Sequence, residues 1–362
     1  MSIRGQEEKR AIHQLLSVFD ATDAQGHLAL LLRKIFRRWG YRSEIFAGTA
    51  VPGRQSGILP AQSLLKGDSP SDLLLYHASI NSPVGELFRR SARKQILIYH
   101  NITPARFFFG FDLFTYLECR KGRRGLPGFI PTCDLALADS SFNAHELLVL
   151  GFSRVELFPF PLDPTRLEGS ADPGVLRRYG EDEVSTILFV GRLAPNKRQE
   201  DILLAFSYFQ RLYRPDSRLI LVGPDNFPEY RRFLDGRVRD LALENVIITG
   251  TVSLEELRAY YRSADLFLCL SEHEGFCLPL LESFYYRIPV VAYAAGAVPE
   301  TLGGAGVILN EKRPLEIAAL LNRVLIDTEL KAKLLAGQDR RLAEIGRYDY
   351  EGRLRHCLRD LL

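Results

Sequence analysis

The chain has 362 residues, of which 46% are apolar and 25% charged, so it has the composition of a globular protein and the length of two domains. It contains no uninterrupted apolar run of roughly 18 to 20 residues, and its polar first ten residues do not resemble a secretory signal. The formal net charge is only +3, and the five dispersed cysteines form no C-x-x-C pair, which argues against a disulfide framework. We therefore expect a cytoplasmic protein with no nucleic-acid partner.

Short apolar runs alternate with amphipathic stretches along the first half of the chain, a pattern typical of β-α-β units around a parallel sheet. The predicted strands are residues 11–19, 43–47, 72–77, 95–99, 135–138 and 155–158. Helices are predicted between them, among others at residues 28–39 and 142–150. Residues 159–180 contain four prolines and little periodicity, which indicates a linker.

A second alternating series follows this segment. Its predicted strands are residues 186–190, 219–222, 246–249, 266–270, 289–293 and 307–309, and its predicted helices are residues 199–212, 254–263, 280–286 and 315–326. The pattern predicts an α/β fold with two Rossmann-like domains, residues 1–165 and 166–345, and a C-terminal helix at 346–362 that packs back on the first domain. Ligands of such sheets bind beyond the carboxyl ends of the strands, so site residues are expected there.

The first candidate motif follows the predicted strand 186–190. Gly191 permits a sharp turn, and Arg192 and Lys197 flank a short loop that opens a helix. Two cations beside a helix N-terminus can hold a diphosphate, because fixed positive charge, backbone N–H donors and the helix dipole coincide there. The alternative interpretation is a pair of surface cations at a domain edge.

The second motif follows the predicted strand 266–270 and runs from Ser271 to Glu282. Gly275 lets a ligand approach the backbone, and Pro279 suits the first turn of a helix. Glu282, one turn into that helix, can accept both hydroxyls of a ribose, and Glu274 lies nearer the sugar. A metal site is the competing interpretation for Glu272, His273, Glu274 and Cys277, but the usual ligand spacings are missing. The chain also has no D-x-D pair, so we expect neither a metal ion nor a cofactor.

The combination of Gly-Arg-x4-Lys at 191–197 with Glu-x7-Glu at 274–282 resembles glycosyltransferase family 4. This resemblance implies the GT-B fold, in which two Rossmann-like domains face each other across a cleft, and retention of the anomeric configuration. It implies that Arg192 and Lys197 bind the donor phosphates, that Glu282 holds the ribose and that Glu274 contacts the transferred sugar. The other donor-side positions that it implies are Gly26, Gly191, Val252, Gly275, Phe276, Cys277 and Leu278. Many relatives have glycine where Arg198 and Cys277 stand.

The first half is similar to bacterial members that build O-antigens and exopolysaccharides, in residues 99–104, 107–108 and 134–140. His100 directly follows a predicted strand and is expected to face the cleft and contact the donor sugar, although a lone histidine is more often structural. The segment 23–27 fits the glycine loop on the acceptor side of these enzymes. Asp23, His27 and Asn101 are the residues expected to face the acceptor.

The expected reaction is metal-independent transfer of a hexose, with mannose from GDP-mannose as the first hypothesis. The acceptor would be a glycan or a lipid-linked oligosaccharide in the synthesis of surface polysaccharide or lipopolysaccharide. Two alternatives remain open, namely a nucleotide-sugar epimerase of GT-B type and a catalytically silent nucleotide-sugar-binding subunit. A nicotinamide dehydrogenase is disfavoured, because no G-x-G-x-x-G follows a predicted strand.

Three basic clusters in the first half favour contact with an anionic surface, although solvated helix faces are the plainer interpretation. The helix at 28–39 joins a leucine-rich face to four cations and the only tryptophan, which suits the headgroup region of an anionic membrane. We therefore expect peripheral contact with the inner face of the plasma membrane through this helix. The clusters are Arg33, Lys34, Arg37 and Arg38; Arg89, Arg90, Arg93 and Lys94; and Arg120, Lys121, Arg123 and Arg124.

Overall fold

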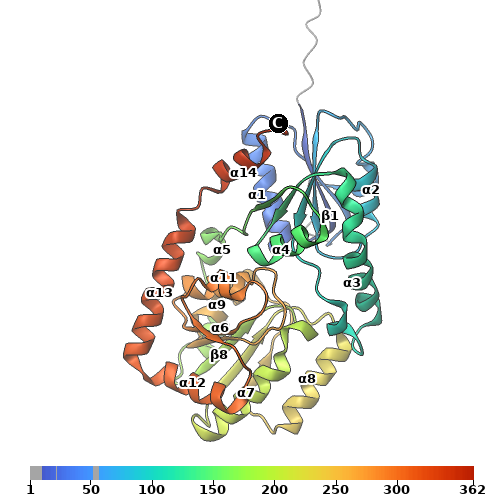
Figure 1. The fold of residues 1–362 in the computed structure, drawn as a ribbon. Helices are drawn as coiled ribbons and strands as arrows, with labels where there is room; N and C mark the ends of the chain where they lie inside the picture. The colour runs from blue at the N-terminus through green and yellow to red at the C-terminus, as the bar shows by residue number, and fades with distance from the viewer. Residues whose placement is uncertain (1–9, 22, 52–56) are drawn as a thin grey trace, which may run out of the picture. The chain divides into compact units, whose positions relative to one another are not determined.

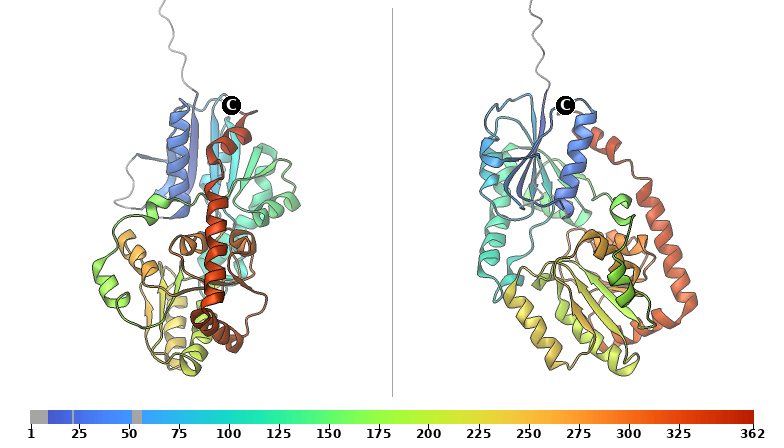
Figure 2. Two further views of the ribbon diagram at one scale, coloured as in Figure 1. Left: turned by 90° about the vertical axis from the view of Figure 1, so that its left-hand side faces the viewer. Right: turned by 180° about the vertical axis from the view of Figure 1, so that it is seen from behind.

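The structure, a computed structural model, describes residues 10–21, 23–51 and 57–362. The chain divides into two compact units (Figures 1 and 2). Unit 1 holds the residues up to 105 together with 117–161 and 349–362, and unit 2 holds 106–116 and 162–348. The predicted division at 165/166 lies four residues from the one seen here, and the return of 106–116 to unit 2 was not predicted.

Unit 1 is built on a seven-stranded parallel sheet of order β3-β2-β1-β4-β5-β6-β7. Its central strands are continuous apolar runs because helices cover both faces of such a sheet. The strands are β1 (Ile12–Phe19), β2 (Ile45–Ala50), β3 (Ile58–Pro60), β4 (Leu73–Ala78), β5 (Lys94–Tyr99), β6 (Cys133–Ala138) and β7 (Val155–Leu157). The main helices are α1 (Ala24–Arg38), α2 (Val84–Arg90), α3 (Leu113–Gly125, shared with unit 2), α4 (Ser141–Leu150) and α14 (Tyr350–Leu358), with 3-10 turns η1 (Ala61–Ser63), η2 (Ala105–Phe108, largely in unit 2) and η3 (Leu126–Thr132).

Unit 2 contains a six-stranded parallel sheet of order β10-β9-β8-β11-β12-β13. The strands are β8 (Thr186–Val190), β9 (Arg218–Val222), β10 (Val246–Ile248), β11 (Leu266–Cys269), β12 (Val290–Tyr293) and β13 (Val307–Leu309). The helices are α5 (Pro164–Leu167), α6 (Pro173–Tyr179), η4 (Pro195–Lys197), α7 (Gln199–Leu212), α8 (Pro228–Asp240), α9 (Leu254–Arg262), α10 (Leu278–Tyr285), α11 (Val298–Leu302), α12 (Pro314–Ile326) and α13 (Thr328–Gly346). In both units the sequence-predicted strands agree with observed ones to within three residues at each end, whereas β3 was not predicted.

The interpretation of residues 159–180 as a linker without structure is wrong over two segments. Helices α5 and α6 each begin at a proline, and Asp163 and Asp172 cap them by accepting hydrogen bonds from Thr165 N and Val175 N. Proline is favoured at the first helical position because its missing N–H is not needed there. The prolines thus mark helix starts in this segment.

The C-terminal segment also differs from the single predicted helix at 346–362. Helix α13 ends at Gly346, and the separate helix α14 lies in unit 1. Arg353 Nη2 donates to Glu156 Oε2 at 2.6 Å, and Tyr350 Oη donates to Phe160 O at 3.1 Å. Over the described residues, none of the helices combines the length and the apolar composition that a membrane-spanning helix needs.

Candidate functional site

The two motifs of the second half meet at the centre of the unit 2 sheet. Strand order reverses between β8 and β11, which are hydrogen-bonded neighbours. Ligands of open parallel sheets bind beyond the carboxyl ends of the strands at such a reversal. The loop after β8 carries residues 191–197 and the loop after β11 carries residues 270–277. The structure therefore brings the two motifs to adjacent strand ends of one unit.

Asn196, which the sequence analysis did not single out, joins these two loops. Its carbonyl oxygen accepts from Glu272 N at 2.9 Å, and its side-chain Nδ2 donates to His273 O at 3.2 Å. Asn196 is buried, so these hydrogen bonds fix the position of one loop relative to the other. A single amide between Pro195 and Lys197 gives little signal in a sequence, and only the fold shows its role.

Lys197 and Glu274 form an ion pair across the two loops. Lys197 Nζ lies 2.6 Å from Glu274 Oε2, and the Glu274 side chain is only 6% exposed. Burial opposes the charge of Lys197, but the nearby charge of Glu274 and its hydrogen bond outweigh this effect and raise the pKa of Lys197. Lys197 is therefore held as a cation at the strand ends.

Arg192 lies at the mouth of the same loop and is exposed. Its guanidinium is 5.3 Å from the centre of the Phe227 ring, and Phe227 in turn packs against Phe108 at 5.3 Å. Gln199 Nε2 donates to Arg192 O at 3.1 Å. An arginine that stacks on an aromatic face can donate hydrogen bonds from N–H groups in the plane of its guanidinium.

Glu282 lies one turn into α10 and is buried. Its Oε2 accepts a hydrogen bond from Tyr261 Oη at 2.6 Å, and the Tyr261 ring stacks on Tyr286. Burial raises the pKa of Glu282, although the hydrogen bond from Tyr261 and the charge of Arg166 act in the opposite direction. Glu282 is thus held in one orientation by Tyr261, which the sequence analysis missed.

The two positions where many relatives have glycine share one backbone property. Arg198 has φ 55° and is the N-cap of α7, and Cys277 has φ 72° and is the N-cap of α10. Glycine adopts positive φ without steric cost, whereas other residues are strained there. Neither helix receives a side-chain cap from these residues. The Arg198 guanidinium instead pairs with Glu200 at 2.8 Å and Asp201 at 3.1 Å.

The loop that carries Glu274 is supported from behind by the segment before α11. Ala297 N donates to Glu274 O at 3.0 Å, and a Cβ at Gly296 would lie 2.2 Å from that oxygen. Thr301 Oγ1 donates to Phe276 O, which fixes the residues beside Gly275. Leu278 is the first residue of α10, and Val252 lies on the loop between β10 and α9.

Cys269, Glu274 and Cys277 form a cluster that the sequence did not predict. One ligand atom of each lies within 4.8 Å of the others. The sequence analysis disfavoured a metal site in this loop, because consecutive residues rarely converge on one ion. The structure nevertheless brings Glu274 and Cys277, two of the four residues considered, close to Cys269 at the end of β11. Lys197 already supplies a positive charge to Glu274 in this cluster.

In unit 1, strand order reverses between β1 and β4, and the expected glycine loop follows β1. The description of residues 23–27 as a loop is wrong, because Asp23 is the N-cap of α1 and residues 24–27 form its first turn. Asp23 Oδ1 accepts from Gly26 N at 2.6 Å, and a Cβ at Gly26 would lie 1.9 Å from Asp20 O. Gly26 therefore allows α1 to begin directly against the turn that follows β1. His27 completes this first turn.

His100 follows β5, as predicted, but its ring is buried. The side chain is 2% exposed, with Nδ1 at 2.8 Å from Asp139 Oδ2 and Nε2 at 2.9 Å from His77 Nδ1. His77 Nε2 continues the chain to Gln14 Oε1 at 3.0 Å. Both ring nitrogens are thus engaged inside unit 1, and the expected contact of His100 with the donor sugar stays a prediction.

Asn101 is also engaged within unit 1. Its φ is 70°, and its Nδ2 donates to Asn143 Oδ1 at 2.8 Å and to Glu146 Oε2 at 3.2 Å. The side chain thus fixes the turn after β5 to α4. An acceptor could meet this turn through its backbone more readily than through the Asn101 amide.

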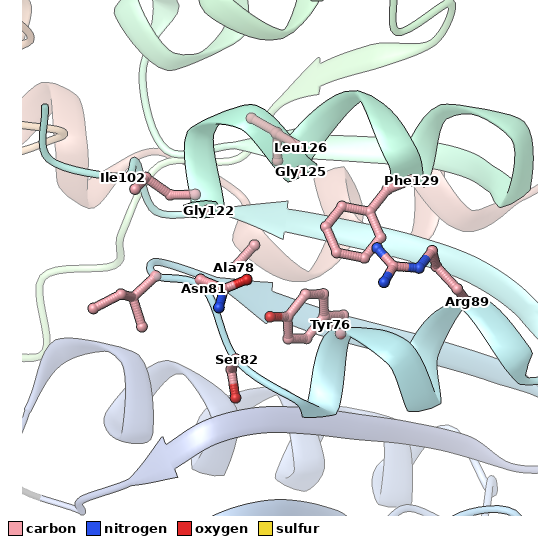
Figure 3. Close-up of a pocket in the computed structure, with 12 residues that line it drawn as sticks. Tyr76, Ala78, Asn81, Ser82, Arg89, Ile102, Gly122, Gly125, Leu126 and Phe129 are labelled. Atoms are coloured by element: carbon pink, nitrogen blue, oxygen red, sulfur yellow. The ribbon is translucent and has the colours of Figure 1, made fainter. Parts of the chain in front are cut away.

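A small pocket of unit 1 lies between β4, α2, α3 and η3 (Figure 3). Tyr76, Phe129 and Arg89 stand along one side of it, with the Arg89 guanidinium 5.1 Å from the centre of the Phe129 ring. None of the site residues expected from the sequence lines this pocket. It therefore forms no part of the candidate donor site.

Comparison with known proteins finds a family model and several curated relatives. Residues 177–338 match the family model described as Glycosyl transferases group 1. A GDP-mannose-dependent alpha-mannosyltransferase of Mycobacterium tuberculosis is 32% identical over 165 residues, which cover 45% of this chain and 40% of that protein. O-antigen chain mannosyltransferase B of Escherichia coli is 29% identical over 231 residues, covering 59% and 55%. The matched segments thus span about half the length of these curated relatives.

Solved structures match over nearly the whole chain. Sucrose-phosphate synthase from Thermosynechococcus elongatus superposes with a TM-score of 0.74 at 17% identity, covering 97% of this chain and 99% of that one. Anabaena Alr3699/HepE in complex with UDP-glucose gives 0.73 at 17% identity and the same coverage. The fold is therefore GT-B, as predicted.

Proposed function

We propose that this chain, which has the GT-B fold, is a group 1 glycosyltransferase and a retaining enzyme that transfers a hexose from a nucleotide diphosphate sugar to a hydroxyl group. The observation that carries the proposal is the position of Arg192 and the Lys197–Glu274 pair, 2.6 Å between charged atoms, at the ends of β8 and β11. Cations at this point, beside an uncapped helix N-terminus at α10, suit a diphosphate.

In the proposed reaction the bond between the anomeric carbon and the diphosphate oxygen breaks, and the acceptor oxygen bonds to that carbon on the same face. Negative charge grows on the leaving diphosphate, where Arg192, Lys197 and the N–H groups of α10 stabilise it. The acceptor proton passes to the leaving phosphate oxygen. This route needs no protein nucleophile and no divalent metal ion.

Two carboxylates would position the rest of the donor. Glu282, held by Tyr261, would accept the hydroxyls of the ribose, because an oriented carboxylate can take two hydrogen bonds. Glu274 would accept a hydroxyl of the transferred sugar with the oxygen that Lys197 leaves available. Both roles require ionised carboxylates, because an ionised carboxylate can accept hydrogen bonds with both oxygens.

We propose mannose as the transferred sugar, GDP-mannose as its donor and a glycan or lipid-linked acceptor of a surface polysaccharide. The support is the similarity to a GDP-mannose-dependent alpha-mannosyltransferase and to an O-antigen chain mannosyltransferase. The matched family region, residues 177–338, contains the whole candidate site of unit 2. The structure neighbour bound to UDP-glucose makes UDP-sugars the natural comparison in a test.

The test is a thermal-shift panel of GDP-mannose, UDP-glucose and other nucleotide sugars, followed by transfer assays with the donor that stabilises the protein most. GDP-mannose is expected to raise the melting temperature, and proton NMR of the fresh product should show an α anomer from an α-configured donor. A β anomer would overturn the retaining assignment. Epimerised nucleotide sugar without transfer would favour an epimerase, and donor binding without any turnover would favour a silent subunit.

A further inference from the structure

Most cations of two of the three basic clusters make contacts inside unit 1. At the end of α1, Arg38 pairs with Glu351, Trp39 Nε1 donates to Glu351 Oε1 at 2.6 Å, and the Arg355 guanidinium lies 4.2 Å from the Trp39 ring centre. The membrane-binding face predicted on this helix stays a prediction, but two of its residues, Arg38 and Trp39, are engaged by α14. In the second cluster, Arg93 is buried against Asp68, and Lys94 Nζ donates to Leu361 O.

The third cluster lies on α3 and differs from the others. Three apolar side chains near the start of this helix are exposed: Leu113 by 69%, Phe114 by 73% and Leu117 by 38%. Arg120, Lys121 and Arg124 near its end are also exposed. Figure 1 labels α3. A surface helix that exposes its apolar residues requires an explanation.

The exposed residues share one side of the helix. At about 100° per residue, positions 113, 114, 117, 120, 121 and 124 fall within about 120° of its circumference. The opposite side carries the buried Cys119 and Gly122, and a Cβ at Gly122 would lie 2.8 Å from Asn81 N. This close contact fixes the rotation of α3 about its axis. The exposed side, which we name the α3 face, therefore cannot turn inward.

The charge of the α3 face decides between possible occupants. None of its six residues is acidic, and Arg120 and Arg124 form no ion pair with any other described residue. Lys121 pairs with Glu118, whose side chain lies beside the face and is 14% exposed. A second copy of the chain docked on this face would bring these cations against other cations or against leucine and phenylalanine. A lipid bilayer offers phosphate groups for the basic part of the α3 face and an apolar layer beneath them for its apolar part.

We propose that the α3 face docks on an anionic lipid bilayer, with Leu113, Phe114 and Leu117 in the acyl boundary and Arg120 and Arg124 at the headgroup phosphates. Such helices lie in the plane of the interface, and apolar burial and charge attraction add. This inference does not rest on the proposed transfer reaction. It is consistent with a lipid-linked acceptor, which would be presented at the same surface.

The test uses the full chain in sedimentation with vesicles of phosphatidylcholine, with and without phosphatidylglycerol. Wild type should bind the anionic vesicles and lose binding in high salt. The double change Arg120→Glu and Arg124→Glu should lower the partition coefficient at least 25-fold, since each cation near the surface contributes about fivefold. The double change Leu113→Gln and Phe114→Gln should lower it at least tenfold.

Matched controls distinguish binding through the α3 face from a general effect of surface charge or of exposed apolar residues. Arg232→Glu with Arg323→Glu makes the same charge change at exposed sites of unit 2, and Leu148→Gln with Val149→Gln changes exposed apolar residues of α4. Both controls should bind like wild type, and circular dichroism should show every variant folded. In Phe114→Trp the new emission should shift to the blue with anionic vesicles, whereas the covered Trp39 of wild type should not respond.

Three results would overturn the proposal. Equal binding of wild type to neutral and anionic vesicles would remove the role of the cations. Unchanged binding of both α3 variants would place the membrane contact elsewhere. A wild-type dimer that Leu113→Gln and Phe114→Gln dissociate, without vesicle binding, would identify a second copy as the occupant. All measurements are made without donor or acceptor, so a failed transfer assay leaves their outcome unaffected.

Discussion

His100 Nδ1 and Asp139 Oδ2, 2.8 Å apart inside unit 1, share a single proton. Gln14 Nε2 donates to Ala29 O, which turns its Oε1 toward His77 and requires a hydrogen on His77 Nε2. Burial holds the pKa of His77 well below its usual value, so His77 is neutral and its Nδ1 accepts from His100 Nε2. A neutral His100 then has no hydrogen on Nδ1.

Two observations favour placing the remaining proton on Asp139. Burial raises the pKa of this carboxyl, although the neighbouring His100 acts in the opposite direction. Its second oxygen, Oδ1, has no hydrogen-bond partner among the described residues, which is costly for a carboxylate and far less so for an acid. The structure thus favours a protonated Asp139 that donates to His100.

Asp139→Asn should therefore leave the free energy of unfolding near the wild-type value, because the amide can donate to His100 Nδ1 as the acid does. Asp139→Ala should lower it by about 1 to 3 kcal/mol, since a buried ring nitrogen loses its partner. Urea unfolding of the two variants measures this difference. Equal destabilisation by both changes would show that an imidazolium and a carboxylate occupy the site instead.

The pairing of Lys197 with Glu274 predicts that a double variant regains stability but not catalytic activity. Lys197→Met should lower the free energy of unfolding by about 3 kcal/mol, because Glu274 remains buried without its cation. Adding Glu274→Gln should restore most of this loss. The turnover number should nevertheless stay at least about 100-fold below wild type, since the cation beside the leaving diphosphate is still missing.

Steady-state kinetics and urea unfolding of the single and double variants test this separation. Glu274→Gln alone serves as the matched control, because it keeps Lys197 and removes only the negative charge. If the double variant regains wild-type turnover, Lys197 has a structural role and does not meet the diphosphate.

Glu282→Gln should weaken donor binding by about 1 to 3 kcal/mol, because the carboxylate no longer accepts both ribose hydroxyls. We choose glutamine since Glu282 is buried and an alanine would leave the Tyr261 hydroxyl without its partner. Tyr261→Phe is the control, as it removes that hydrogen bond and keeps the carboxylate. Calorimetry with the nucleotide sugar measures both, and an unchanged affinity of Glu282→Gln would remove the ribose assignment.

Most strands of the two sheets and the loops of the candidate donor site could be predicted from the sequence, because their signals are local. Short apolar runs mark the strands, and glycine, arginine and glutamate residues mark the loops that follow them. The ion pair of Lys197 with Glu274 joins residues 77 positions apart, and the order of the strands decides it. The burial of His100 depends on His77, which lies near the end of β4, and on Asp139, which directly follows β6. Side-chain direction at a strand end is not encoded in the local pattern.

The pH dependence of stability should reveal the buried His13. Burial, with the charge of Arg93 adding to it, lowers the pKa of His13 to about 4, and its Nδ1 accepts from Glu44 N at 3.2 Å. The unfolded chain takes up this proton near pH 6.5 and the folded chain only near pH 4, so stability falls as pH falls through this window. His13 alone should cost about 2 kcal/mol between pH 7 and pH 5. His13→Gln should flatten the curve in urea unfolding, and an unchanged slope would contradict the assignment.

Removal of metal ions should leave activity intact. Cys269, Glu274 and Cys277 lie close enough to hold a thiophilic ion, with ligand atoms within 4.8 Å of one another. Lys197 Nζ, however, stands at Glu274 and supplies the positive charge that an ion would bring. A zinc ion at this cluster would compete with that ammonium for the same carboxylate oxygen.

We therefore expect full turnover after exhaustive dialysis against EDTA and no bound zinc by atomic absorption. Cys269→Ser should behave like wild type in the same assay, whereas a loss of turnover that Zn²⁺ or Mg²⁺ restores would show that a metal ion assists the leaving diphosphate.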